Sequence, residues 1–196
     1  MRYYITDRHQ LGGIEPLLPV IASALAAGIE MIQIREKDLS TRELLALVER
    51  VLALPNPAGT QIFINDRVDV AIASGTRCVH LPGNSIAPRR ILTSVPPPFQ
   101  IGVSCHSVED VRRAEEESAT FAVFGPIFTT GSKQPLGLAA LREAASAVHM
   151  PVLALGGISG SRIRECMDQG AAGIAGIGLF QGPLQTDRNF DCYSGV

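Results

Sequence analysis

A loop in the second half of the chain combines hydroxyl groups with a positive charge. It follows a short apolar run, residues 121–124, which the pair Gly125-Pro126 interrupts. Around Gly131 the loop carries four polar side chains: Thr129, Thr130, Ser132 and Lys133. Several hydrogen-bond donors, a flexible backbone and a cation are what a phosphate or diphosphate group needs. The same composition is typical of an ordinary surface loop, so the interpretation depends on the elements that position it.

A buried strand that ends in a polar or glycine-bearing turn recurs along the whole chain. Eight short apolar runs have the composition of strands buried on both faces. They cover residues 2–6, 30–34, 61–64, 78–81, 100–103, 121–124, 152–155 and 173–177. Helical patterns separate them over residues 16–27, 40–54, 68–73, 107–118, 138–148 and 159–170, and a short helix begins at Pro88. Eight such strand–helix units predict an α/β fold, a closed (β/α)8 TIM barrel.

The barrel is expected to occupy residues 1–196 as a single domain. Residues 181–196 are polar and irregular, and they give little sign of a full eighth helix. The alternative fold, an open doubly wound sheet, requires the pattern G-x-G-x-x-G after the first strand. Residues 5–13 read ITDRHQLGG and lack that pattern, which favours the barrel.

Composition narrows the classes of partner and compartment. The 196 residues are 46% hydrophobic with a net charge of −2, and no basic run is present, so neither nucleic acid nor a membrane surface is indicated as a partner. No apolar stretch reaches the ~20 residues that span a bilayer, and the N-terminus lacks a signal-peptide pattern. The four cysteines have no C-x-x-C spacing; reduced thiols and a cytoplasmic location are therefore expected. Formation of a homo-oligomer stays open.

The chemistry of a TIM barrel lies at the C-terminal ends of its strands. Polar residues and glycines occupy these ends: Arg35, Lys37, Asn65, Asp66, Ser85, Ser104, His106, Thr130, Ser132, Lys133, Gly156, Gly157 and Gly178. Three cations come from two of the strand ends, and the glycine pair before a helix lets backbone N–H groups approach a phosphate. We therefore predict an anion site, in which Asp66 is either a salt-bridge partner or a Mg²⁺ ligand.

Plainer interpretations stay open for several of these residues. The run 35–37 could be surface charge, and His106 could be an ordinary polar residue at the start of a helix. His80 lies inside the fourth strand, where a satisfied core residue is the expected state. Cys105 and His106 are neighbours on a strand and should point to opposite faces, so they are not interpreted as a catalytic pair.

At these residues the chain resembles the thiamine-phosphate synthase superfamily, which also contains the thiazole tautomerases. The resemblance extends from Tyr3 to about Phe180. Its motifs are IQIREK at 32–37, INDRVDVA at 64–71, VHLPG at 79–83, IGVSCHS at 101–107, FGPIFTTGSK at 124–133 and ALGGIS at 154–159. Several separate motifs in the same order make the resemblance specific for the superfamily and less specific for a branch within it.

The resemblance implies a transferase that joins hydroxymethylpyrimidine diphosphate to hydroxyethylthiazole phosphate and releases diphosphate. The pyrimidine and its diphosphate would be held by Gln33, Arg35, Lys37, Asn65 and the catalytic Lys133. The thiazole and its phosphate would be received by Thr130, Ser132, Gly157, Ile177 and Gly178. Asp66 would ligate Mg²⁺, and the catalytic Ser104 would lie beside the reacting methylene. Cations and Mg²⁺ would stabilise the charge of the leaving diphosphate.

Two positions depart from the synthase pattern. Ser85 stands where synthases carry an Asp as a second Mg²⁺ ligand, and Gly178 stands where they carry a Ser. The wording HLPGNS at 80–85 is closer to the tautomerase branch, which moves a proton without a metal and whose acid/base group matches His106. Lys37, Asp66 and Lys133 favour the synthase, because they suit a diphosphate that the tautomerase substrate lacks. A third alternative is a non-catalytic barrel that binds a thiamine precursor or phosphate.

Overall fold

Eight parallel strands close into a barrel in sequence order, with β1 paired to β8. The computed structural model describes residues 1–131 and 134–181. The strands are β1 (Arg2–Ile5), β2 (Met31–Ile34), β3 (Gln61–Asn65), β4 (Cys78–Leu81), β5 (Gln100–Cys105), β6 (Phe121–Phe124), β7 (Val152–Leu155) and β8 (Gly173–Gly176). The TIM-barrel prediction is confirmed. The single domain over residues 1–196 stays a prediction, because residues 182–196 lie outside the described part.

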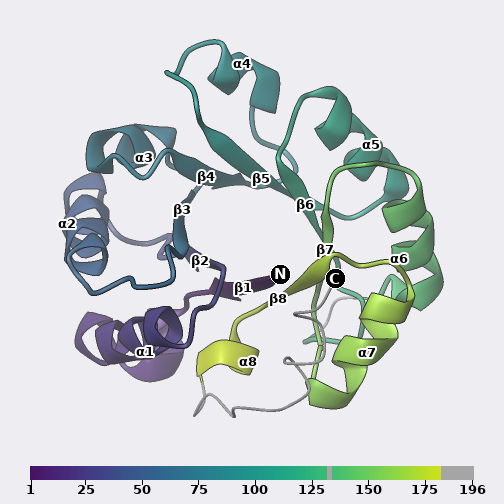
Figure 1. Ribbon diagram of the computed structural model, residues 1–196, viewed down its shortest axis with the longest axis horizontal. Helices are drawn as coiled ribbons and strands as arrows, with labels where there is room; N and C mark the ends of the chain where they lie inside the picture. The colour runs from purple at the N-terminus through teal and green to yellow at the C-terminus, as the bar shows by residue number, and fades with distance from the viewer. Residues whose placement is uncertain (132–133, 182–196) are drawn as a thin grey trace.

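Helices form a ring around the strands (Figure 1). They are η1 (Arg8–Leu11), α1 (Ile14–Ala26), α2 (Thr41–Leu52), α3 (Val68–Ser74), α4 (Pro88–Leu92), α5 (Val108–Glu116), α6 (Gly137–Ser146), α7 (Gly160–Asp168) and α8 (Gly178–Gln181). Two helices begin at the serines that the sequence indicated. Ser40 forms a capping box with Glu43 ahead of α2, and the Ser107 hydroxyl accepts the Asp110 N–H ahead of α5, which satisfies N–H groups of the first turn.

Side chains alternate between the barrel interior and the surrounding helices, as the two-residue period of a strand requires. The interior cluster consists of Tyr3, Ile5, Met31, Phe63, Cys78, Phe121, Val123, Leu153 and Ala175. The intervening residues, such as Tyr4 on β1 and Ile32 on β2, pack outward beneath the helices. Gln33, Asn65 and Ser104 occupy interior-facing positions nearer the C-terminal ends of their strands.

The structure corrects several element boundaries. β5 continues to Cys105, two residues past the predicted end, and β8 ends at Gly176. Gly178 therefore begins the short helix α8 and is not the end of a strand. The sequence pattern also missed η1, whose four polar and apolar residues are too few to show a period. No helix among the described residues is long and apolar enough to cross a membrane.

Candidate active site

The C-terminal ends of all eight strands lie at one mouth of the barrel, because the strands are parallel and the sheet is closed. This topology brings together predicted site residues that lie far apart in the sequence, from Gln33 on β2 to Ile177 after β8. Ser132 and Lys133 lie outside the described residues. The other predicted residues occupy this mouth or the loops that surround it.

Gln33 lies at the floor of the mouth with an unused hydrogen-bond donor. Its side chain is 1% exposed, and its Nε2 has no hydrogen-bond partner within the described part of the chain. An unpaired buried donor costs about 1–3 kcal/mol. A buried amide that is left unpaired inside a mouth is a position at which a polar ligand restores the missing hydrogen bond.

The segment after β2 carries Arg35 and Lys37, and a buried carboxylate between them holds it in place. Glu36 is 4% exposed, so it is not the surface charge that one interpretation of the sequence allowed. Its Oε1 accepts a hydrogen bond of 2.6 Å from the Thr6 hydroxyl, whose oxygen accepts the Arg35 N–H at 2.9 Å. Thr6 thus joins the end of β1 to the backbone of Arg35 and to the side chain of Glu36.

Arg8 completes this anchor. Its backbone N–H lies 3.2 Å from both carboxylate oxygens of Glu36, and its Nη1 lies 3.2 Å from Oε2. The guanidinium also binds both oxygens of Asp38, at 2.6 and 2.5 Å. These contacts raise the pKa of Arg8 and hold the pKa of Asp38 well below its usual range, in each case chiefly through the hydrogen bond between the two. Glu36 and Asp38 are thereby paired with Arg8, and Lys37 stays exposed at the mouth.

A cavity of about 230 Å³ lies between the β2–α2 and β3–α3 loops, and Lys37, Asn65 and Asp66 line it. Asp66 Oδ1 accepts a hydrogen bond of 3.3 Å from the Ser85 hydroxyl, so Ser85 stands next to the one carboxylate predicted to bind metal. No group of three or more His, Cys, Asp or Glu that could hold a metal ion occurs among residues 1–131 and 134–181. The arrangement fits a metal that takes most of its ligands from a substrate and from water.

Ser104 is linked to the barrel interior through His80. The two residues come from neighbouring strands, β4 and β5, with His80 paired to Gly102. His80 Nε2 lies 2.9 Å from Ser104 Oγ, and His80 Nδ1 lies 3.3 Å from the Tyr3 hydroxyl. Burial, and then the charge of Arg35, lower the pKa of His80 to about 3. The prediction that His80 is a satisfied core residue is correct, but its contact with Ser104 was not foreseen.

The loop after β6 lies against the glycine turn after β7. The Phe128 N–H donates to the Gly156 carbonyl at 3.1 Å, and a Cβ on Gly157 would stand 2.8 Å from the Thr129 carbonyl. Gly157 also has a backbone φ of +63°, which residues with a side chain rarely adopt. These contacts place Thr129 beside Gly157, and the exposed Thr130 follows it in the same loop.

Arg162, at the start of α7, was not among the predicted site residues. Its Nη1 donates to the Gly157 carbonyl at 2.7 Å, and its guanidinium lies 4.4 Å from the centre of the Phe128 ring. Nothing in the local sequence signals this position, because the contact depends on how two loops meet.

His106 and Cys105 point to opposite sides of β5, as expected. Cys105 is buried in the cluster beneath the helices, and burial raises the pKa of its thiol to about 12. His106 Nδ1 donates to the Gly125 carbonyl at 2.5 Å. Its Nε2 is therefore the nitrogen available to a ligand, an arrangement that suits either branch of the superfamily.

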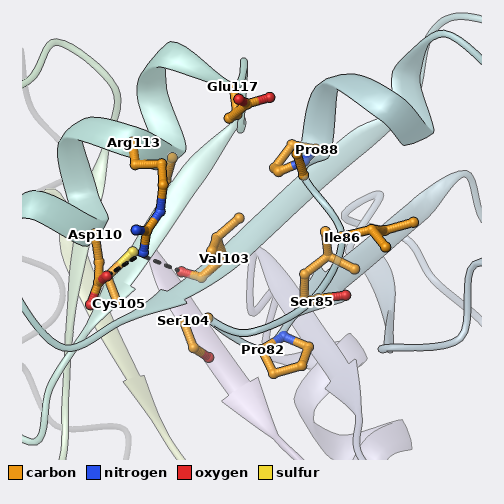
Figure 2. Close-up of a pocket in the computed structure, with 14 residues that line it drawn as sticks. Pro82, Ser85, Ile86, Pro88, Val103, Ser104, Cys105, Asp110, Arg113 and Glu117 are labelled. Atoms are coloured by element: carbon orange, nitrogen blue, oxygen red, sulfur yellow. Dashed lines mark hydrogen bonds and ion pairs between the residues drawn. The ribbon is translucent and has the colours of Figure 1, made fainter.

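A second cavity, of about 130 Å³, extends from the mouth outward between α4 and α5. Figure 2 shows Ser104 and Pro82 at one end of the cavity and Glu117 at the other, with the Arg113 guanidinium beside Asp110 between them. Asp110 is already paired there, with the Arg113 guanidinium at 2.5 Å and the His106 N–H at 3.1 Å. Because these polar groups satisfy one another, the barrel mouth is the better candidate for substrate.

Comparison with known proteins identifies the family. A family model described as thiamine monophosphate synthase matches residues 2–180. The chain belongs to the thiamine monophosphate synthase family. It is 43% identical to "Putative thiamine-phosphate synthase 2" of Aquifex aeolicus, with 91% of this chain and 96% of that protein covered. It is 37% identical to the thiamine-phosphate synthase of Roseiflexus sp. (strain RS-1), with 89% and 75% covered.

Solved structures agree with the family. The thiamine phosphate pyrophosphorylase from Pyrococcus furiosus superposes with a TM-score of 0.82 at 32% identity, covering 93% of this chain and 87% of that one. FabK from Thermotoga maritima, at 16% identity and a TM-score of 0.68 over 83% of this chain and 54% of that one, shares the fold alone. The predicted superfamily and transferase class are confirmed. The comparisons lend no support to the tautomerase or to a non-catalytic barrel.

Proposed function

We propose that this member of the thiamine monophosphate synthase family joins hydroxymethylpyrimidine diphosphate to hydroxyethylthiazole phosphate and releases diphosphate. The observation that carries the proposal lies at the mouth, where the buried Gln33 Nε2, which has no hydrogen-bond partner among residues 1–131 and 134–181, meets the anchored segment that presents Arg35 and Lys37. The amide suits a heterocycle that offers hydrogen-bond acceptors, and the cations suit a diphosphate.

We assign the roles from the floor of the mouth outward. Gln33 binds the pyrimidine, while Arg35, Lys37, Asn65 and Lys133 hold the diphosphate. Ser104 lies beside the bond that breaks. The carbon–oxygen bond of the pyrimidine methylene cleaves, and the diphosphate leaves with the electron pair. Fixed cations stabilise this developing charge better than mobile water does. Lys133 has this role by prediction, since it lies outside the described residues.

The second substrate is placed on the opposite side of the mouth. Thr130, Ser132, Gly157, Ile177 and Gly178 receive the thiazole and its phosphate. The thiazole nitrogen then forms the new carbon–nitrogen bond with its lone pair. Holding the nitrogen next to the methylene supplies much of the rate enhancement, because it removes the entropy cost of the encounter.

Asp66 is proposed to ligate Mg²⁺ together with oxygens of the diphosphate. When bound, the ion neutralises part of the diphosphate charge and makes it a better leaving group. With Ser85 in place of a second carboxylate, this chain relies on substrate oxygens for most of the ligands. We further propose that the protein is cytoplasmic and that phosphorylated small molecules are the only partners of the site. Whether the chain forms a homo-oligomer is left to measurement.

The test is an assay of both substrate sets, with and without a chelator. We expect thiamine phosphate and diphosphate to form from the pyrimidine and thiazole substrates, and the reaction to stop when Mg²⁺ is removed. Conversion of thiazole phosphate carboxylate in the presence of a chelator, lost in His106→Asn, would instead establish the tautomerase. If the protein converts neither substrate set, the remaining alternative is a non-catalytic barrel that binds a thiamine precursor or phosphate.

The variant Gln33→Met tests the pyrimidine position. It replaces the amide with an apolar side chain of similar volume, so the free energy of unfolding should stay equal or rise, because the buried Nε2 has no described partner. The KM for the pyrimidine diphosphate should rise by tenfold or more, since a site built around a hydrogen bond discriminates strongly. An unchanged KM would remove Gln33 from the site.

A further inference from the structure

A chain of three side chains runs from the barrel interior to the mouth. The hydroxyl of Tyr3 lies 3.3 Å from His80 Nδ1, and His80 Nε2 lies 2.9 Å from Ser104 Oγ. Tyr3 is fully buried and His80 is 3% exposed, whereas Ser104 is half-buried at the mouth. The mechanism above uses Ser104 alone and assigns nothing to the two groups behind it.

The interior is built around these two rings. Tyr3 packs edge-on against Phe63 and Phe121, with ring centres 5.6 and 5.4 Å apart. On β5, a Cβ at position 102 would stand 2.4 Å from the Phe121 ring and 2.8 Å from His80 Nδ1. Glycine at 102 therefore makes the space in which the imidazole lies between Tyr3 and Ser104.

The direction of the hydrogen bonds follows from counting donors. A phenol hydroxyl has one proton, and the only partner of the Tyr3 hydroxyl within the described residues is His80 Nδ1. If Nδ1 carried a proton, the Tyr3 proton would be buried without an acceptor, at the cost of an unmade hydrogen bond. Tyr3 therefore donates to Nδ1. In a neutral imidazole the proton then lies on Nε2, which donates to Ser104 Oγ.

We propose that Tyr3 and His80 are positioning residues that fix Ser104 as a hydrogen-bond donor toward the mouth. Because the Ser104 oxygen already accepts the Nε2–H, its own proton points to the ligand side. Ser104 then binds an anionic oxygen and does not act as a base. The anionic oxygen belongs to the leaving diphosphate, an assignment that rests on the proposed function. The direction of the hydrogen bonds does not depend on the proposed function.

The direction can be measured without any substrate. In protein labelled with ¹⁵N-histidine, long-range ¹H–¹⁵N correlation spectra distinguish a protonated from an unprotonated ring nitrogen. The chain has four histidines, so single Gln substitutions of His9, His106 and His149 assign the remaining signals to His80. We expect Nε2 protonated and Nδ1 unprotonated near neutral pH. A protonated Nδ1 would overturn the proposal, whatever reaction the protein catalyses.

The variant Tyr3→Phe tests the link to catalysis, and Tyr4→Phe is its matched control. The neighbouring Tyr4 hydroxyl is also buried but has no hydrogen-bond partner within the described residues. Tyr3→Phe should lower kcat by roughly fivefold to tenfold, the scale of one hydrogen bond, and should change the His80 tautomer populations. Tyr4→Phe should change neither.

A double-mutant cycle separates positioning from a general loss of packing. If Tyr3 acts through Ser104, then Tyr3→Phe should cause no further loss of kcat in a Ser104→Ala background. Equal losses in both backgrounds would overturn the proposal. If the wild-type protein forms no thiamine phosphate, the proposed function fails, while the tautomer measurement still decides whether the hydrogen-bond direction is right.

Discussion

Ser85 donates a hydrogen bond to Asp66 at the position where a second metal-binding carboxylate was expected from the sequence. With one carboxylate, Mg²⁺ should bind the free protein weakly and bind more tightly with diphosphate present. We predict that Ser85→Asp increases Mg²⁺ affinity by about tenfold or more, because two carboxylates share the ion. Calorimetry with Mg²⁺ and diphosphate, separately and together, provides the measurement.

The control for this substitution is Ser146→Asp, which adds the same charge at an exposed position at the end of α6. It should leave Mg²⁺ affinity unchanged. Equal Mg²⁺ affinities for Ser85→Asp and wild type would show that Asp66 is a salt-bridge partner and not a metal ligand.

The sequence predicts the site residues whose positions follow from the strand pattern alone. Gln33, Arg35, Asn65 and Ser104 were predictable, because a strand's C-terminal end and its two-residue alternation place them at the mouth. The contact of His80 with Ser104 could not be predicted, because the two residues lie 24 residues apart and meet only through the register of β4 and β5.

At the scale of elements, the segment between β2 and α2 depends on its buried anchor. Glu36→Gln keeps the shape of the side chain but turns an acceptor into a donor facing the N–H groups of Arg8. We predict a loss of about 1–3 kcal/mol in the free energy of unfolding and a roughly tenfold weaker affinity for diphosphate, because Arg35 and Lys37 lose their fixed backbone. Chemical denaturation and calorimetry measure the two effects.

Glu49→Gln on the exposed face of α2 is the matched control, since it removes the same charge away from the mouth. It should change neither quantity appreciably. If Glu36→Gln lowers stability but binds diphosphate as tightly as wild type, the anchor supports the fold and does not position the cations.

The elements themselves were largely predictable, and the exceptions are short. All eight strands were expected, because each is an apolar run bounded by turn residues. η1 and α8 have four residues each, which is about one turn and too short for a helical period. The hydrogen bond between Thr6 and Glu36 could not be predicted from the sequence, because it joins the ends of β1 and β2 across 30 positions.

At the scale of the whole molecule, the closed core shields its thiols. Cys78, Cys105 and Cys166 are buried and free, as the sequence predicted, whereas Cys192 lies outside the described residues. Burial raises the pKa of Cys78 and Cys166 to about 11. We predict that all three resist alkylation at about pH 8 until the barrel unfolds, because the thiolate is the reactive form. Peptide-resolved mass spectrometry, with and without denaturant, reports the labelling.

The same shift gives a pH dependence with a definite sign. Burial raises the pKa of each thiol above the ordinary value that it has in the unfolded chain, so the folded protein holds these protons more tightly than the unfolded chain. Stability from this source is present below about pH 9 and is lost as the pH rises toward 11 or 12. Rapid alkylation of Cys105 in the native protein would show that the helices on β5 open locally.

The pairing of β1 with β8 has a consequence for how the protein is made. Arg2 pairs with Ile174 and Tyr4 with Gly176. β1, which is synthesised first, therefore cannot complete its hydrogen bonds until β8, which is synthesised last, is available. Until nearly the whole chain has emerged from the ribosome, both edges of the growing sheet lack partners, and unpaired edges invite association with other chains. The slow step in biogenesis is therefore expected to be the meeting of these two strands, a contact of long sequence separation.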